Sequence, residues 1–411
     1  MTKPAALAAS RIAKAKDNYL KPIRIGLLWH SLRAGNLGVG ALTLGNIAIL
    51  REIAEAGGWP VEFVVLSMRE SSTAPIADGI AQYEIDTKRL FSPSGFAREV
   101  STLDCVLDIG AGDSFADIYG FKRFVFLWYT KWLSVRVGKP LVLAPQTIGP
   151  FTRQPYKTMA AWIMERASAV VARDEKSLGV VRELAPRADA HRAVDVAFKL
   201  PFENRKIAEN HGRKLRVGIN ASGLLCKQAE SGQNRFGLSY DYLELHRKLI
   251  GHFSEQPDCE VHLVTHANSL GDAGDDDGTW ADRLAAEFPD TIRVPDFKGP
   301  GEAKSYISGL DFLVAGRMHA CIAAFSSATP VVPVSYSRKF SGLFDLLGYP
   351  FYTPMADISA AEMFDRIIDD FSKRAEMAQA ETEALAKVEA MFEPYRQVMS
   401  RIFSEIETSR K

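Results

Sequence analysis

Residues 311–320, DFLVAGRMHA, decide the fold class of this chain. An apolar run ends in glycine, Arg317 and His319 follow at once, and a helix-like run continues to about Ser326. In an open α/β sheet the carboxyl end of a strand faces the ligand crevice. An arginine and a histidine in this position are suited to an anion that must also gain or lose a proton. The alternative is structural: Arg317 caps a local carbonyl and His319 begins a helix.

Short apolar runs alternate with amphipathic stretches along the rest of the chain, which is typical of βαβ units and a mostly parallel sheet. We expect strands at residues 23–29, 61–67, 105–109, 140–144, 168–172, 215–220, 260–265, 291–294 and 331–334, and before Arg317. We expect helices at residues 41–56, 156–166, 240–253, 279–287 and 304–309. The pattern predicts two α/β lobes that face each other across a cleft.

The length of 411 residues exceeds one ordinary core, so we expect more than one domain. The polar stretch at residues 201–213 breaks the pattern and marks the linker. We divide the chain into an N-terminal arm at 1–20, lobes at 21–205 and 213–359, and a C-terminal helical tail at 360–411.

Composition excludes several classes of protein. Lys+Arg and Asp+Glu number 50 each, which removes bulk charge as an argument for nucleic-acid binding. The four cysteines lie far apart, without zinc spacing or a disulfide framework, so a reducing cytoplasmic setting fits best. No apolar run approaches about 18 residues, so no membrane span is expected. The basic arm is a solvated tail or, alternatively, a peripheral membrane contact.

Glycine-rich loops follow two of the expected strands. Residues 35–43, GNLGVGALT, place Asn36 and Gly38 at a helix N-terminus that favours an anion. The loop lacks the spacing of a dinucleotide site or a P-loop, and the alternative is a turn that only the fold requires. Residues 108–120, DIGAGDSFADIYG, carry a second set of candidates: Gly112, Asp113, Ser114 and Asp117.

The two aspartates of this second loop are four residues apart and would share one face of a helix. We expect Asp113 or Asp117 to bind sugar hydroxyls or to act as a general base. The alternative is helix capping by Asp113 or Ser114. The position at the carboxyl end of a strand favours the functional interpretation.

Four further segments hold candidates for ligand contact. Gln146 lies in a rigid loop, PQTIGPF. Arg173 follows a strand in ARDEKS, where it either pairs with an acidic neighbour or faces the cleft. Lys339 in SYSRKFSG adds positive charge near Arg317, and His266 ends a strand. The acidic residues 272–277 lack the alternation of a calcium loop, so we expect a solvated loop there and no metal site.

In this order, the motifs GNLGVGALT, DIGAGDSFADIYG, PQTIGPF, VARDEKS, VDVAFKL and GRMHACIAAFSSATPVVPVSYSRKFSG resemble the polysaccharide pyruvyl transferase family over residues 23–350. The Arg-x-His-Ala block followed by Tyr-x-x-Lys is the most specific part. The resemblance implies a GT-B-like fold of two Rossmann-type lobes. It also implies transfer of a pyruvyl group from phosphoenolpyruvate to a sugar, with formation of a cyclic ketal.

The resemblance places phosphoenolpyruvate on the C-terminal lobe, against Arg317, the backbone of Met318, and His319, with Arg173 as a further contact. The N-terminal lobe would then hold the saccharide acceptor, and phosphoenolpyruvate is the donor substrate with no cofactor implied. One departure concerns the acceptor side, where Ala111 stands in a Gly-Ala-Gly-Asp sequence and a Gly-Gly pair is more usual.

Two other functions remain as alternatives at this stage. A GT-B glycosyltransferase that uses a nucleotide sugar shares the fold, but it would usually place an acidic residue after the last strand, where this chain has Ser335, Arg338 and Lys339. A non-catalytic paralogue would be expected to lack Arg317 or His319. The expected setting is exopolysaccharide synthesis in the cytoplasm or at the inner face of the cytoplasmic membrane, with lipid linkage of the acceptor and the oligomeric state left open.

Overall fold

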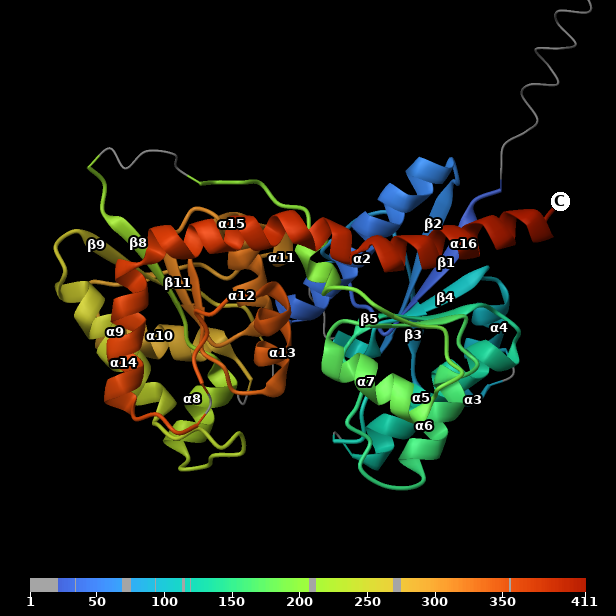
Figure 1. The fold of residues 1–411 in the computed structure, drawn as a ribbon, viewed down its shortest axis with the longest axis horizontal. Helices are drawn as coiled ribbons and strands as arrows, with labels where there is room; N and C mark the ends of the chain where they lie inside the picture. The colour runs from blue at the N-terminus through green and yellow to red at the C-terminus, as the bar shows by residue number, and fades with distance from the viewer. Residues whose placement is uncertain are drawn as a thin grey trace, which may run out of the picture.

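The computed structural model describes residues 21–411, apart from residues 34, 69–74, 93, 113–114, 119, 207–211, 269–274 and 355. The side chain of Arg338 is also outside the description. The predicted N-terminal arm, residues 1–20, lies outside the described residues. Figure 1 shows two α/β lobes side by side, with a run of helices along one side of both.

The first lobe contains a seven-stranded sheet in the order β3-β2-β1-β4-β5-β6-β7. All of its strand pairs are parallel. Its strands are β1 (Ile23–Leu28), β2 (Val61–Met68), β3 (Ala81–Ile85), β4 (Cys105–Asp108), β5 (Leu141–Gln146), β6 (Ala169–Ala172) and β7 (Ala190–Arg192). Helices cover both faces, so central strands such as β5 are buried along their whole length.

The second lobe contains a five-stranded parallel sheet in the order β10-β9-β8-β11-β12. Its strands are β8 (Leu215–Asn220), β9 (Cys259–Leu263), β10 (Ile292–Arg293), β11 (Phe312–Ala315) and β12 (Val331–Pro333). Both sheets therefore have the doubly wound order in which the first strand is central. The predicted fold class of two Rossmann-type lobes is confirmed.

Helices of the first lobe are α2 (Leu37–Gly57), α3 (Thr87–Phe91), α4 (Phe96–Ser101), α5 (Phe121–Arg136), α6 (Tyr156–Met164) and α7 (Glu175–Leu184), with the short helices η1 (Gly110–Gly112) and η2 (Val196–Lys199). Helices of the second lobe are α8 (Gly223–Glu230), α9 (Tyr242–Glu255), α10 (Asp277–Glu287), α11 (Pro300–Ile307), α12 (Met318–Phe325) and α13 (Arg338–Leu347). The lobes meet where α2 packs on α11 and α12.

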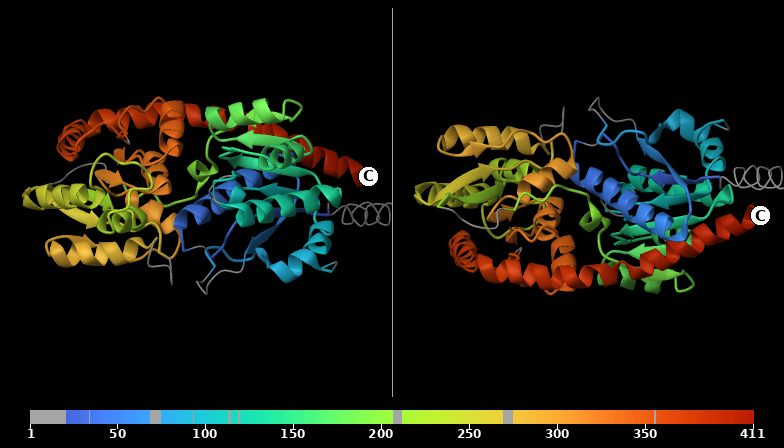
Figure 2. Two further views of the ribbon diagram at one scale, coloured as in Figure 1. Left: turned by 90° about the horizontal axis from the view of Figure 1, so that it is seen from below. Right: turned by 90° about the horizontal axis from the view of Figure 1, so that it is seen from above.

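The last three helices connect the two lobes: α14 (Ala360–Ser372), α15 (Arg374–Met391) and α16 (Glu393–Ser409). Helix α14 packs on α9 of the second lobe, and α16 packs on α2 and β7 of the first. Figure 2 shows this run extending along the length of the molecule. A buried hydrogen bond from the Tyr395 hydroxyl to Asn46 Oδ1, at 2.8 Å, fixes α16 to α2.

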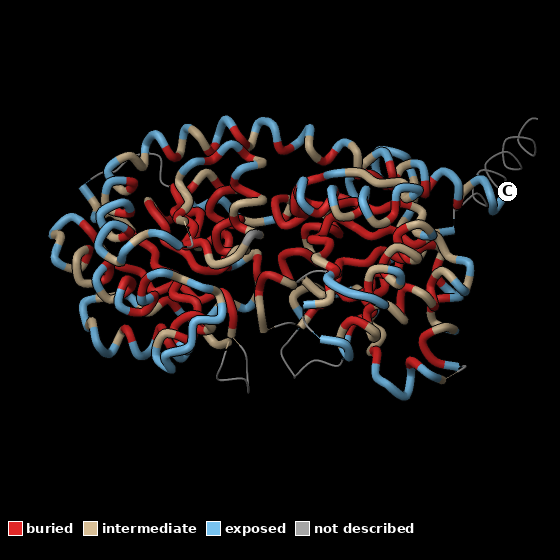
Figure 3. The backbone as a smooth tube through the Cα atoms, turned by 60° about the horizontal axis from the view of Figure 1, so that its bottom comes forward, coloured by how far each residue is buried: buried red, intermediate tan, exposed pale blue. Residues whose placement is uncertain are grey.

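The apolar core forms two clusters of buried side chains. One joins α2, α16 and the second lobe, and the other fills the opposite face of the first sheet beneath α5 and α6. Figure 3 shows the buried strands at the centre of each lobe and the exposed segments around them. Helix α2 is long and apolar enough to span a membrane, but 72% of its most apolar window is buried, as in a core helix. The four cysteines are buried and free.

The predicted strands match the described ones to within a few residues, but several elements were not predicted. The sequence analysis missed β3, β7, α3, α4, α5, α8 and α13. Helix α2 begins four residues before the predicted start, because Asn36 caps it by accepting a hydrogen bond from Gly38 N at 2.9 Å. The short strands β3 and β7 form because they pair with neighbouring strands, and this pairing cannot be read from their own residues.

Candidate functional site

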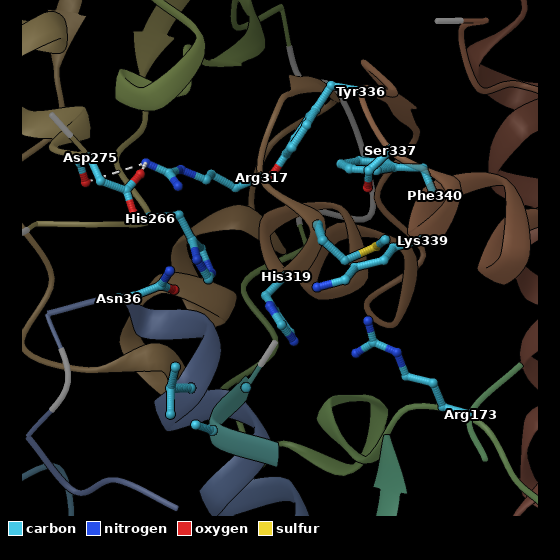
Figure 4. Close-up of a pocket in the computed structure, with 14 residues that line it drawn as sticks. Asn36, Arg173, His266, Asp275, Arg317, His319, Tyr336, Ser337, Lys339 and Phe340 are labelled. Atoms are coloured by element: carbon cyan, nitrogen blue, oxygen red, sulfur yellow. Dashed lines mark hydrogen bonds and ion pairs between the residues drawn. The ribbon is translucent and has the colours of Figure 1, made fainter. Parts of the chain in front are cut away.

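A cavity of about 200 Å³ lies between the two lobes, at the carboxyl ends of both sheets. The first lobe contributes the N-terminus of α2, the short helix η1 and the end of β6, and the second lobe contributes the segments that follow β9, β11 and β12. Figure 4 shows the side chains pointing toward one another from these segments. The lining residues are Asn36, Val39, Ala111, Gly112, Arg173, His266, Asp275, Arg317, Met318, His319, Tyr336, Ser337, Lys339 and Phe340.

Arg317 is a buried cation held in place by carboxylates. Its Nε and Nη2 donate to Asp277 Oδ1 at 3.0 and 2.7 Å, and Nη2 lies 2.6 Å from Asp275 Oδ1. Burial acts to lower the pKa of Arg317, but the charges of Asp277 and Asp275 outweigh it and raise the pKa. The guanidinium is therefore always charged, and its orientation is fixed at the cavity wall.

Asp277 connects this arginine to the frame of the second lobe. Its side chain is 1% exposed and accepts hydrogen bonds from the backbone N–H groups of His266, Ala267 and Gly223 at 2.8–3.1 Å. The prediction of a solvated acidic loop was wrong for Asp277, because five donors, including Arg317, offset the cost of burying its charge. Residues 272–274 of that loop lie outside the described residues.

His319 lies in the first turn of α12 and meets the first lobe. A Cβ atom built on Gly38 would lie 2.3 Å from His319 Nδ1, so only glycine permits the observed approach. His319 Nε2 lies 4.0 Å from Asp195 Oδ2. The predicted loop residue Gly38 therefore lies beside His319 behind the cavity wall and is absent from its lining.

Arg173 reaches the cavity from the end of β6. Its Nη1 donates to Asp195 Oδ2 at 2.6 Å, and both side chains are almost fully buried. The sequence left open whether Arg173 pairs with an acidic neighbour or faces the cleft. In the structure Arg173 lines the cavity, and its acidic partner is Asp195 rather than an adjacent residue. Asp195 thus lies between Arg173 and His319, which come from opposite lobes.

His266 and Asn36 lie where the two lobes are bonded to each other. Leu37 N donates to His266 O at 3.1 Å, and Asn268 N donates to Gly35 O at 2.9 Å. Burial, with a smaller contribution from His319, lowers the pKa of His266 to about 3. The His266 ring is therefore neutral near pH 7 and offers a hydrogen bond rather than a charge.

Three further predicted residues line the cavity: Met318, Lys339 and Gly112. Figure 4 shows the Lys339 side chain extending from α13 toward His319. Ala111, next to Gly112, has φ 58° and ψ 33°, a left-handed conformation that favours glycine. Ala111 therefore stands at a position where the backbone conformation itself prefers glycine.

Besides Gly38, two described residues among the predicted ones, Gln146 and Asp117, are absent from the cavity lining. Gln146 Nε2 donates to Asp108 O and Oδ2 at 2.9 and 3.0 Å, beneath the cavity. Asp117 accepts from Thr152 N and Oγ1 at 2.6 and 2.8 Å, because a bridge between Phe115 and Ile148 prevents the helix that would have aligned it. Asp113 and Ser114 lie outside the described residues, so their roles remain predictions.

The residues of this site that the sequence analysis missed include Asp195, Asp275, Asp277 and Tyr336. A signal for Asp195 existed, since it lies in the VDVAFKL motif, and Tyr336 begins the Tyr-x-x-Lys block. The described residues contain no group of three or more His, Cys, Asp or Glu side chains placed to hold a metal ion. The arrangement is suited to holding a small anion beside an imidazole.

Comparisons with known proteins agree on the family and the fold. A family model described as polysaccharide pyruvyl transferase matches residues 13–338. The amylovoran biosynthesis protein AmsJ of Erwinia amylovora is 22% identical over 267 residues, which is 62% of this chain and 62% of that protein. The match therefore spans less than two thirds of that relative.

Solved structures resemble this chain in fold. Anabaena Alr3699/HepE, solved with UDP and glucose, has 14% identity and a TM-score of 0.52 over 94% of this chain and 100% of its own. The α,α-trehalose-phosphate synthase (UDP-forming) of Burkholderia vietnamiensis has 11% identity and a TM-score of 0.52 over 95% and 100%. These similarities confirm the GT-B-like fold. With a family model that covers most of its length and the motifs around the cavity, the chain belongs to the polysaccharide pyruvyl transferase family.

Proposed function

We propose that this protein transfers a pyruvyl group from phosphoenolpyruvate to a saccharide and forms a cyclic ketal, in exopolysaccharide synthesis. The observation that carries the proposal is the convergence of Arg173, Arg317, Lys339 and His319 on one cavity between the lobes. Family membership and the similarity to an amylovoran biosynthesis protein support the polysaccharide setting. The donor and the ketal product are what the family resemblance implies, and the cations and the histidine of the cavity are consistent with that donor.

The cavity suits phosphoenolpyruvate in charge and size. Phosphoenolpyruvate carries a phosphate and a carboxylate, and guanidinium groups bind both kinds of anion through paired hydrogen bonds. Asp275 and Asp277 pair with Arg317, Asp195 pairs with Arg173, and Lys339 adds a third cation to the cavity lining. The volume of about 200 Å³ lies below the 300–1,000 Å³ typical of sites for larger ligands, which favours a small donor over a nucleotide sugar.

The reaction begins when the methylene carbon of phosphoenolpyruvate gains a proton, which leaves the adjacent carbon electron-deficient. His319 is placed to donate this proton, with Asp195 4.0 Å away to stabilise its charged form. One sugar hydroxyl then attacks the electron-deficient carbon, the carbon–oxygen bond to phosphate breaks, and a second hydroxyl closes the ketal. The two hydroxyl protons balance the proton on the methyl group and the one carried off by phosphate.

Calorimetry with phosphoenolpyruvate and, separately, UDP-glucose tests the donor. Lys339→Gln removes a charge at the cavity, and Lys248→Gln, on the exposed face of α9, is the matched control. We expect phosphoenolpyruvate to bind, Lys339→Gln to weaken binding about tenfold or more, and the control to bind as the parent does. Arg317→Ala is less informative, because it leaves Asp275 and Asp277 without their shared cation.

Binding of UDP-glucose with no binding of phosphoenolpyruvate would replace this proposal with glycosyl transfer from a nucleotide sugar. The acid role has its own test. His319→Gln is expected to bind phosphoenolpyruvate but to release no phosphate from it when acceptor oligosaccharides are present. Phosphate release at the parental rate would remove His319 from the mechanism.

A further inference from the structure

Helix α5 has apolar residues on two of its sides. Phe124 and Leu127 are buried in the core cluster beneath the first sheet. Residues at i, i+4, i+7 and i+11 share the other side, where Phe121 is 61% exposed and the rest are half-buried: Phe121, Val125, Trp128 and Trp132. Helix α6 covers part of this side, through the ring contact of Trp128 with Trp162 and the hydrogen bond from Trp128 Nε1 to Met159 O at 2.8 Å. The exposed ring of Phe121 is not explained by this packing.

Aromatic contacts extend this second side into a continuous patch over α3, α5 and α6. Ring centroids lie 5.1 Å apart for Phe91 and Tyr129, 5.4 Å for Tyr129 and Trp132, and 6.2 Å for both Trp128–Trp132 and Trp128–Trp162. Phe91 is 63% exposed. We call this patch the aromatic face, defined by Phe91, Phe121, Trp128, Tyr129, Trp132 and Trp162. Figure 1 shows α5 and α6 on the side of the first lobe away from α16.

The stretch from α5 to α6 carries charge of a single sign. The chain as a whole has a formal net charge of +0, yet residues 121–164 contain no Asp or Glu. Their cations are Lys122, Arg123, Lys131, Arg136, Lys139, Arg153 and Lys157. Among these, Lys131 is buried against Asp108, whereas Lys122, Arg136 and Arg153 are exposed and make no ion pair within the described part of the chain.

We propose that the aromatic face docks on the surface of an anionic phospholipid bilayer. Tryptophan and tyrosine favour the boundary between lipid and water, and lysine and arginine beside them are attracted to anionic head groups. The carboxylate-free stretch at residues 121–164 provides the charge complementarity. A second copy of the chain on the same face would bring like charges together, which disfavours a symmetric dimer there.

The docking surface and part of the cavity wall belong to the same lobe and are close along the chain. Gly112 lines the cavity at the end of η1, and α5 begins at Phe121, so eight residues (113–120) separate them along the chain. A bilayer bound to α5 therefore lies on the lobe whose helix η1 forms part of the cavity wall. If the proposed function holds, this arrangement would present a lipid-linked saccharide to the site; the docking itself requires no substrate.

Vesicle flotation tests the docking on the full chain, with phosphatidylcholine vesicles and with vesicles that also contain phosphatidylglycerol. One variant carries Lys122→Gln, Arg136→Gln and Arg153→Gln, and another carries Phe91→Ser and Phe121→Ser. Matched controls change exposed residues elsewhere: Lys227→Gln, Lys298→Gln and Lys387→Gln together, and Ile292→Ser alone. Each lysine or arginine near an anionic surface contributes about fivefold to binding, so the charge variant should lose roughly a hundredfold.

We expect the parent and the controls to float with the anionic vesicles and not with neutral ones, and binding to weaken as salt is raised. The Phe91→Ser, Phe121→Ser variant should lose binding even at low salt. Absence of binding to anionic vesicles, or unchanged binding of the charge variant, would overturn the proposal. A dimer in analytical ultracentrifugation that the Phe91→Ser, Phe121→Ser variant dissolves would instead assign the aromatic face to a second copy. Because no phosphoenolpyruvate is used, these outcomes are independent of the proposed function.

Discussion

Gly38 of the first lobe lies against the imidazole ring of His319 of the second, and a Cβ atom on Gly38 would lie 2.3 Å from Nδ1 and 2.9 Å from Cγ. The contact places the ring between α2 and the cavity. Two backbone hydrogen bonds between the lobes, Leu37 N to His266 O and Asn268 N to Gly35 O, flank it. The position of the proposed acid therefore depends on how the two lobes meet.

Gly38→Ala should displace the His319 ring, because atoms 2.3 Å apart overlap and the ring is softer than the helix backbone. We expect phosphate release from phosphoenolpyruvate to fall about a hundredfold, with a loss of stability of only about 1–3 kcal/mol. Steady-state kinetics and urea unfolding measure the two effects. Gly179→Ala in α7, with no atom within 4 Å of the added Cβ, is the control and should keep full activity. Equal rates for both variants would contradict the positioning role.

Ala111→Gly should stabilise the protein. Ala111 has φ 58°, and a left-handed conformation costs a residue with a Cβ atom roughly 1–2 kcal/mol. Glycine also loses more conformational entropy than alanine on folding, which offsets part of this gain. We therefore expect a net increase of about 1 kcal/mol in the free energy of unfolding. Ala328→Gly is the matched control, since its φ is 54° and it does not line the cavity.

Both glycine variants should raise the unfolding midpoint in urea by similar amounts. Only Ala111→Gly alters the cavity wall, so Ala328→Gly should leave phosphoenolpyruvate binding unchanged. A destabilised Ala111→Gly variant would show that the methyl group contributes packing that outweighs its backbone conformation.

Asp195→Asn should destabilise the protein and make it more responsive to the donor. The variant leaves Arg173, 7% exposed, without its carboxylate at 2.6 Å, which we expect to cost about 3 kcal/mol. Phosphoenolpyruvate then supplies a negative charge to Arg173, so it should raise the thermal midpoint more in the variant than in the parent. Asp86→Asn, at an exposed helix N-cap, keeps the oxygen that accepts from Arg89 N and removes only a surface charge, so it should cost less than about 1 kcal/mol. A smaller donor-induced shift in Asp195→Asn would argue against contact between Arg173 and the donor.

Glu381→Gln should stabilise the protein above neutral pH. Burial raises the pKa of Glu381 well above 4.5, and hydrogen bonds from the Tyr349 hydroxyl and Val331 N lower it only in part. The folded protein keeps a proton that the unfolded chain releases above pH 4.5, so this side chain loses about 1.4 kcal/mol of stability per pH unit until the folded pKa is reached.

Glutamine keeps the shape and the acceptor oxygen but has no proton to lose. We therefore expect Glu381→Gln to be more stable than the parent at pH 8, with a difference that shrinks toward pH 5, measured by urea unfolding at each pH. Glu383→Gln, on the exposed side of α15, is the control and should follow the parent. A difference that is constant with pH would show that Glu381 is ionised in the folded protein.

The sequence predicted most of the core strands because a buried parallel strand is an apolar run of fixed length between turn residues. It did not predict α5, which has apolar residues on both sides and therefore lacks the helical period. Strands β3 and β7 lie at the edges of the first sheet and are half-exposed. Their formation depends on pairing with β2 and β6 rather than on their own residues.

Some of the candidate residues predicted at strand ends line the cavity, and others do not. Arg317, His319, Arg173, Asn36 and His266 could be named from sequence because each follows a predicted strand, and parallel strands bring their carboxyl ends to one edge. Gln146 and Asp117 follow the same rule but form hydrogen bonds with Asp108 and Thr152 beneath and beside the cavity. A position at a strand end is therefore not sufficient for reaching the cavity.

By itself, the sequence determined the two lobes, the family and the cationic ends of the strands, since periodicity and motif order are local properties. Only the tertiary structure decided which charges meet. Asp195 and Asp277 lie 124 and 40 residues from His319 and Arg317, respectively, when counted from their numbers. A buried cation must find its carboxylate wherever the fold brings one within about 3 Å. Distances between such partners depend on the packing of whole lobes, and no local pattern encodes them.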